Sequence, residues 1–286
     1  MLFSKSQTVK DRVVEALGSG PIRITVLIEY LSKHGEPVSK QGIYGALREL
    51  ARDEVVVVYK KQVSLNHAWL MRLADFSGIA HQRYFEHEKP TSHFKDLKPN
   101  QRTRLTFKNL SLLDAFWGHV LYTLIENNPT HEPLLMYNPH WWFAYSRNPS
   151  EIAILDFCKR QNTPLLETIG HNTPIDRSTA KFMDGVHAQY HVRTKPLFKK
   201  DNYYINVLGE FIIDVWIDKD LHAVIEKLYH EETHVTKEWI DRLEALNTIK
   251  GKSMLVVSRN PKRANELRKK LLRPFTIPKH SYTTSS

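Results

Sequence analysis

The chain reads ITVLIEYLSKHGEPVSKQGIYGALRELARDEVVVVYKKQVSLN over residues 24–66. In its first segment apolar residues recur at three- and four-residue spacing, Thr25 can serve as N-cap, and Gly35 ends the helix. Ser39 can cap a second helix that carries its own apolar stripe. Two β-rich runs then flank a bend at Lys60-Lys61. The stretch therefore predicts a helix, a short turn, a second helix and a two-stranded hairpin.

The second helix has a polar face opposite its apolar stripe. Lys40 and Gln41 lie at its N-terminal end, and Tyr44 and Arg48 follow on the same face. A helix-turn-helix places its second helix in the major groove of DNA, where polar side chains near that end reach base edges. A basic hairpin tip would contact phosphates or the minor groove. The pattern favours contact with a duplex.

This order of elements, and the segment VSKQGIYGALRELARDE in particular, resembles the winged helix-turn-helix domains of transcriptional regulators over about residues 6–75. Gly42 and Gly45 depart from a strong recognition helix, because each costs about 1 kcal/mol relative to alanine. The alternative is a winged helix used only for protein contacts. The resemblance implies that DNA is bound by Ser39, Lys40, Gln41, Tyr44, Arg48, Lys60 and Lys61.

Composition is that of an ordinary globular protein, with 41% hydrophobic and 25% charged residues in 286. A chain of this length is expected to hold two domains. Its net charge of +10 is uneven: residues 1–75 carry +3, residues 76–248 carry −2, and residues 249–286 carry +9. The basic C-terminal segment either attracts polyanions through counterion release or is simply a solvated tail.

Several classes of protein are not expected. No apolar run approaches 18 residues, so we expect no membrane span, and the first residues lack the apolar core of a secretory signal. The lone Cys158 permits no internal disulfide. We therefore expect a cytoplasmic protein.

The remainder of the chain alternates strands and helices. Residues 88–104 hold prolines and many charges and are predicted to be a linker. The predicted fold is an α+β winged-helix domain at residues 1–87, the linker, an α/β sandwich with a mixed, partly parallel sheet at residues 105–248, and a basic strand, helix and tail at residues 249–286.

The segments YNPHWWFAYSRNPSEIAILDFCKRQ and YYINVLGEFIIDVWID resemble the C-terminal domain of TrmB-like regulators, over about residues 130–230. The resemblance implies a phospholipase-D-like domain without catalysis that senses a ligand or dimerises. An aromatic tract follows a predicted strand, where α/β sheets place ligand crevices. It forms either an effector pocket or dimer contact, or merely a cap on the core; the candidate residues are His140, Trp141, Trp142, Tyr145 and His171.

Motifs for catalysis are weak. HEETH, from His230 to His234, matches the H-E-x-x-H zinc motif, with Glu231 as general base. Its two middle residues are polar, however, and it lies where one helix is expected to end and the next to begin. HFKDLKPN has Asn100 where the phospholipase signature needs aspartate, and no G-x-S-x-G occurs. The sequence predicts no enzyme, no metal ligand and no cofactor.

The sequence thus predicts a sequence-specific transcriptional regulator that binds double-stranded DNA. A homodimer is expected, because DNA sites are usually two-fold symmetric, and the second domain could take a small-molecule effector. One alternative is an antitoxin-like or mobile-element interaction protein that binds nucleic acid through its tail. The other is a zinc hydrolase that uses HEETH.

Overall fold

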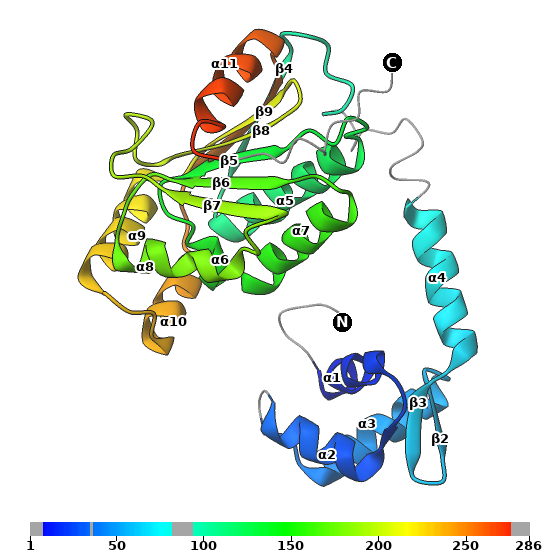
Figure 1. Ribbon diagram of the computed structural model, residues 1–286. Coiled ribbons are helices and arrows are strands. Elements are labelled where there is room, and N and C mark those ends of the chain that lie inside the picture. Colours follow the sequence, from blue (N-terminus) through cyan, green and yellow to red (C-terminus); the bar gives the residue numbers. More distant parts are fainter. Residues whose placement is uncertain (1–7, 35–36, 82–93, 276–286) are drawn as a thin grey trace. The chain divides into compact units, whose positions relative to one another are not determined.

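The computed structural model describes residues 8–34, 37–81 and 94–275, and the chain divides into two compact units, Met1–His87 and Glu88–Ser286 (Figure 1). Each unit has a hydrophobic core of its own. Among the described residues, no helix is both long and apolar enough to cross a membrane.

The first unit contains the helices and the hairpin that the sequence predicts. A three-stranded antiparallel sheet has the order β1-β3-β2, because the two-residue strand β1 pairs with the hairpin. The elements are α1 (Val9–Ala16), the 3-10 turn η1 (Leu17–Ser19), β1 (Ile22–Arg23), α2 (Ile24–Lys33), α3 (Lys40–Arg52), β2 (Val56–Tyr59), β3 (Gln62–Leu65) and α4 (His67–His81).

The start of α3 follows from one hydrogen bond. The Ser39 side chain accepts from the backbone N–H of Gly42 at 3.1 Å, which confirms the predicted cap. The cap predicted at Thr25 is wrong, because α2 begins earlier, with Arg23 at the N-cap and no side-chain bond. The apolar stripes of the three helices and of the hairpin meet in one core of Val13, Val14, Leu17, Leu27, Leu31, Ile43, Leu47, Leu50, Val56 and Val63.

Most apolar side chains of helix α4 are exposed, although Trp69 packs partly buried against the core of the first unit. Leu70 is 39% exposed, Phe76 70% and Ile79 53%. The helix begins at His67, directly after the hairpin. Further along it, the side chains of Leu70, Phe76 and Ile79 are not buried against the described residues.

The second unit is built on a seven-stranded mixed sheet of order β4-β10-β9-β8-β5-β6-β7, in which only the β5-β6 and β6-β7 pairs are parallel. The predicted mixed, partly parallel sheet is confirmed. Its elements are β4 (Arg102–Phe107), α5 (Leu110–Glu126), β5 (Leu134–Asn138), α6 (Phe143–Ser146), α7 (Asn148–Arg160), β6 (Leu165–Ile169), α8 (Pro174–Ser178), η4 (Thr179–Phe182), β7 (Ala188–Val192), β8 (Tyr203–Leu208), β9 (Phe211–Trp216), α9 (Lys219–Glu231), α10 (Lys237–Leu246), β10 (Ser253–Arg259) and α11 (Pro261–Leu271).

Helices cover both faces of this sheet, which makes three layers (Figure 1). Along β5, Leu134 and Met136 join the larger core, to which α5, α7, α9 and α10 contribute. The alternate residues Leu135 and Tyr137 pack on the other face, against α11. Strands buried on both faces lose the polar alternation of a solvated sheet, which explains the uninterrupted apolar run of β5.

Two predicted boundaries need correction. Phe94 and Leu97 are buried in the larger core and β4 begins at Arg102, so residues 94–104 are not a linker; residues 82–93 lie outside the described residues. Strand β4 lies at the edge of the sheet, and every second side chain along it is exposed. Arginines occupy two of these exposed positions, as is common in edge strands, so the composition of β4 is similar to that of a loop. The strand and helix predicted within residues 249–286 are present as β10 and α11, but they belong to the second unit, because β10 lies between β4 and β9 inside the sheet; residues 276–286 lie outside the described residues.

Candidate nucleic-acid interface

Helix α3 presents one polar face to solvent. Gln41, Tyr44, Gly45 and Arg48 fall at the i, i+3, i+4 and i+7 positions of that face, and Tyr44 is 47% exposed. The opposite face is buried through Ile43, Ala46, Leu47 and Leu50. All seven residues predicted to bind DNA are exposed: Ser39, Lys40, Gln41, Tyr44, Arg48, Lys60 and Lys61.

The cations of this surface have no anionic partners in the part of the chain that the structure describes. Lys10 and Lys33, in contrast, are paired with Glu49 at 3.0 Å and with Glu29 at 2.6 Å. Since the positive charge of Arg48 is not neutralised within the described residues, the α3 surface is suited to an anionic partner.

The hairpin tip adds two lysines in an uncommon backbone conformation. Tyr59 pairs with Gln62, which leaves a two-residue loop in which Lys60 has φ 46° and Lys61 has φ 65°. Two-residue hairpin loops with positive φ at both positions strongly prefer Asn-Gly. A residue with a Cβ costs about 1 kcal/mol or more in this region. The chain therefore holds two strained lysines at the point of the hairpin, as functional sites commonly do.

The aromatic tract of the second unit does not form a surface. Trp141, Trp142 and Tyr145 are 3%, 0% and 6% exposed, and the Trp142 indole donates to the Tyr204 hydroxyl at 3.2 Å. These side chains pack within the core, so they offer no contact to a second copy of the chain. This corrects the prediction of a dimer contact and agrees with the alternative that the tract caps the core.

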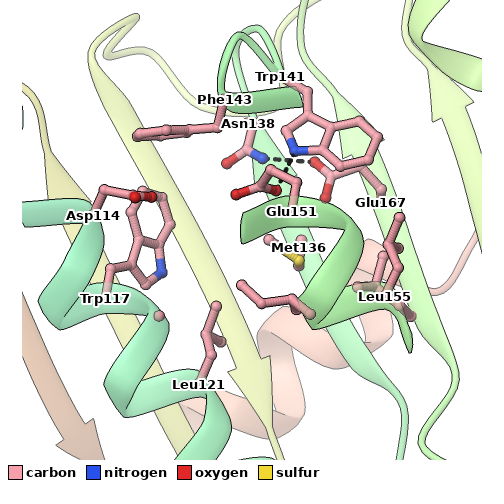
Figure 2. Close-up of a pocket in the computed structure, with 13 residues that line it drawn as sticks. Asp114, Trp117, Leu121, Met136, Asn138, Trp141, Phe143, Glu151, Leu155 and Glu167 are labelled. Atoms are coloured by element: carbon pink, nitrogen blue, oxygen red, sulfur yellow. Dashed lines mark hydrogen bonds between the residues drawn. The ribbon is translucent and has the colours of Figure 1, made fainter. Parts of the chain in front are cut away.

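Trp141 does line a small cavity between the sheet, α5 and α7 (Figure 2). Its indole donates to Glu151 Oε2 at 2.8 Å, and the Asn138 amide donates to Glu167 Oε1 at 2.8 Å. The volume of about 20 Å³ is that of a single water site, so the cavity cannot hold a metabolite.

The carboxyl groups of this cavity are unusual. Burial raises the pKa of Glu167 well above its ordinary value, and the charge of Glu151 adds to the effect. Burial likewise raises the pKa of Glu151 to about 8, with the charge of Asp114 adding to it. Both groups are therefore expected to hold a proton at neutral pH, which is how acids without cationic partners become tolerable inside a core.

His140 and His171 are brought together by the sheet. They follow β5 and β6, which are adjacent and parallel, and their rings stack with centroids 4.6 Å apart. The parallel pairing of β5 and β6 therefore makes the two histidines neighbours. Gly170 permits the close approach of the two strand ends, because a Cβ at that position would collide with the Tyr137 hydroxyl.

A carboxylate from α9 meets these histidines. Glu226 Oε1 lies 3.1 Å from His140 Nε2, 3.2 Å from His222 Nε2 and 3.8 Å from His171 Nε2. His230 approaches the other oxygen of Glu226 at 3.7 Å. The sequence analysis missed His222 and Glu226. The signal available was the H-x₃-E-x₃-H spacing from His222 to His230, which places all three residues on one helix face.

The orientation of His140 is fixed from its other side. His140 Nδ1 lies 2.8 Å from Asp176 Oδ1, and the second oxygen of Asp176 accepts from the backbone and hydroxyl of Thr173 in a capping box. Burial lowers the pKa of His140, but the hydrogen bond with Asp176 and the charges of Asp176 and Glu226 outweigh it and raise that pKa to about 9. Burial raises the pKa of Glu226, but its contacts with His140, His222 and His171 hold the net value well below the ordinary one.

An open pocket of about 310 Å³ lies beside this cluster. The HEETH motif contributes to its wall but is not a zinc helix, because α9 ends at Glu231 and His234 bonds to the neighbouring Thr233. The pocket is lined by His171, Asn172, Thr173, Pro174, Tyr229, His230, Glu232 and Thr233.

No model of a known protein family matches the chain, and no curated protein matches it. Among solved structures the fold is similar to TrmBL2, described as an archaeal chromatin protein with a novel mode of DNA binding. The TM-score is 0.33 at 11% identity, over 93% of this chain and 91% of that one. It is also similar to PadR of Bacillus subtilis, with a TM-score of 0.23 at 12% identity, over 85% and 96% of the two chains. Because both TM-scores are below 0.5, we draw the function from the residues of this chain alone.

Proposed function

We propose that the protein is a DNA-binding transcriptional regulator whose first unit is a winged helix. Helix α3 would lie in the major groove, and the tip of the β2-β3 hairpin would contact the DNA backbone or the minor groove. The observation that carries the proposal is the pairing of an exposed α3 face, whose cations are not neutralised within the described residues, with a strained lysine tip at the neighbouring hairpin.

The roles of the residues follow from their chemistry. Arg48 can bond guanine through two parallel hydrogen bonds, and Gln41 can do the same with adenine. Lys60 and Lys61 would contact phosphates, which adds affinity without sequence preference. Ser39 is already used as the helix cap, so its hydroxyl contributes to the start of α3 more than to base reading.

Selection of bound sequences from random DNA, at a stated salt concentration, tests this proposal. The full chain should enrich a defined site. Arg48→Ala should lower affinity for it about 10- to 100-fold and relax the preference at one position, as expected for 1–3 kcal/mol of base reading. Lys61→Ala should weaken binding to all sequences alike and reduce the salt dependence by about one charge.

Arg242→Ala is the matched control, because Arg242 is an exposed arginine of the second unit that pairs with Glu231 at 3.4 Å. It should leave both affinity and preference unchanged. Failure to enrich any sequence, or an Arg48→Ala protein that binds the enriched site as the parent does, would overturn the proposal.

A homodimer and a ligand response form part of this proposal. The exposed apolar side chains of α4 offer a contact to a second copy of the chain. For an effector, the aromatic tract provides no room, whereas the open pocket beside His171 does. No catalytic role is assigned to HEETH, since its two histidines do not share a helix.

Nucleic-acid binding through the basic C-terminal segment is the competing hypothesis, and the internal pairing of that segment weighs against it. Arg263 bonds Asp214 through both terminal nitrogens, at 2.6 and 2.7 Å, and Arg268 bonds Glu132 at 2.7 Å. Truncation before β10 would remove an internal strand, so the exposed Lys262 and Lys269 should be replaced by glutamine instead. Loss of DNA binding in that variant, with Arg48→Ala silent, would favour the competing hypothesis.

A further inference from the structure

The proton on Nδ1 of His140 is fixed by its hydrogen-bond partner. A carboxylate can only accept, so the 2.8 Å contact with Asp176 requires the proton on Nδ1 of His140. Nε2 of the same ring then points at a second carboxylate, Glu226 Oε1, at 3.1 Å. Two electron-rich atoms at this distance need a cation between them, either a proton on the ring or a metal ion.

A single proton does not account for the whole arrangement. The Nε2 atoms of His140, His171 and His222 all lie within 3.8 Å of the same Glu226 oxygen. Each of these nitrogens, and that oxygen, is buried and forms no properly aligned hydrogen bond among the described residues. His140 is 0% exposed and His222 5%, so bulk water does not reach them. A buried polar group without a partner costs about 1–3 kcal/mol, and four such atoms converge here.

We propose that this cluster is a binding site for one divalent transition-metal ion of the zinc type. His140 Nε2, His171 Nε2 and Glu226 Oε1 would be the ligands, and their donor atoms lie within 4.8 Å of one another. Asp176 would be the outer partner that orients His140, as carboxylates commonly do for metal-bound histidine.

The donor set and its spacing select the class of ion. Two imidazoles and one carboxylate are typical of zinc sites that keep an open position, whereas calcium and magnesium prefer oxygen ligands alone. Bonds of about 2.0–2.1 Å in a tetrahedron separate neighbouring ligand atoms by about 3.3 Å. The contacts of Glu226 Oε1 with His140 and His171, 3.1 and 3.8 Å, bracket that separation.

Charge and access agree with this assignment. A divalent ion would balance the two carboxylates of Glu226 and Asp176, leaving the imidazoles neutral in a largely buried site. His171 also lines the open pocket of about 310 Å³, which gives the ion an entry path and a place for a further ligand. This site departs from the sequence prediction of no metal ligand.

Zinc titration of the untagged, chelator-treated full chain, in competition with a chromophoric chelator and without DNA, tests the site. The parent protein should take up one tight equivalent. Asp176→Asn should weaken binding about 10- to 100-fold, as loss of an outer partner does, while His171→Ala and Glu226→Gln should weaken it further. His234→Ala should bind as the parent does, because this exposed histidine lies outside the cluster.

Cobalt(II) provides a second measurement. The cobalt-loaded parent should have the strong visible absorption of a four-coordinate ion, and His171→Ala, whose side chain is only partly buried, should lose it while keeping the parent's circular dichroism. If Glu226→Gln does not fold, the zinc affinity and the cobalt spectrum of His171→Ala still test the metal site. Absence of a tight zinc equivalent, or equal effects of His171→Ala and His234→Ala, would overturn the proposal and leave a proton-bridged network. Since no DNA is present, either result is independent of the proposed DNA binding.

Discussion

Lys60 and Lys61 occupy a turn that another sequence would fill more stably. Replacing them together by Asn-Gly should stabilise the first unit by about 1–2 kcal/mol, because both positions have positive φ. The same change should weaken DNA binding, because it removes two cations. Denaturant unfolding and binding at fixed salt measure the two effects. Equal or improved DNA affinity would mean that the hairpin tip does not contact DNA.

Gly45 is a second residue that lowers the stability of its helix, and no packing contact there requires a glycine. A Cβ added there would meet no atom within 4 Å, and the residue lies between Tyr44 and Arg48 on the exposed face of α3. Gly45→Ala should raise stability by about 1 kcal/mol through helix propensity. It should also weaken DNA binding if α3 lies deep in the groove.

Gly118 provides the matched control for this substitution. It lies inside α5 of the second unit and likewise has open space around its Cβ position. Gly118→Ala should stabilise by a similar amount and leave DNA affinity unchanged. If both alanine variants bind DNA as the parent does, close approach of α3 to the duplex is contradicted.

Glu167 makes the stability of the second unit depend on pH. Burial raises its pKa above the ordinary 4.5, so the folded state binds more protons than the unfolded state as pH rises above that value. The free energy of unfolding should therefore fall as pH increases from about 4.5, with no penalty below it. Glu167→Gln mimics the protonated form and should flatten this slope. Glu244→Gln, an exposed glutamate of α10, should keep the slope of the parent.

Sequence reasoning at the scale of single residues succeeded where contacts are local. Periodicity alone placed Tyr44 and Arg48 on the exposed face, and a hydroxyl before a helix identified the Ser39 cap. It failed for Glu226, because two of the partners of that carboxylate, His140 and His171, come from the ends of two strands far away in the chain. Only the tertiary fold brings such residues together.

At the scale of elements, long periodic segments were predicted well, and those whose burial depends on distant neighbours were not. The second helix and the hairpin predicted within residues 24–66 are present as α3 and the β2-β3 pair. The edge strand β4 was taken for linker, because its alternating charges are explained only by its position beside β10.

The exposed apolar side chains of α4 predict that the protein dimerises through this helix. Leu70, Leu73, Phe76 and Ile79 are exposed at three-residue spacing, and Arg72 and Asp75 are its only acidic or basic residues apart from histidines, so two copies would not repel. We expect a dimer in sedimentation equilibrium that Phe76→Glu converts to a monomer. Val186→Glu is the control, because Val186 is an apolar residue of the second unit that is 62% exposed, against 70% for Phe76, and this change should leave the dimer intact. A monomeric parent, or a Phe76→Glu protein that remains dimeric, would remove α4 from the assembly.

At the scale of the whole molecule, the core of the first unit shares no residue with the cores of the second, so the two units should unfold in separate transitions. Ile43→Val in the first unit and Ile213→Val in the second each remove one buried methylene, at about 1 kcal/mol. Because a smaller unit has a smaller unfolding entropy, the first substitution should lower its own transition by about 4–8 °C and the second by about 2–4 °C. Scanning calorimetry of the full chain measures both. A single transition that either substitution lowers would show that the two units unfold as one. DNA and zinc would then both stabilise that transition, whereas separate units would each be stabilised by only one of these ligands.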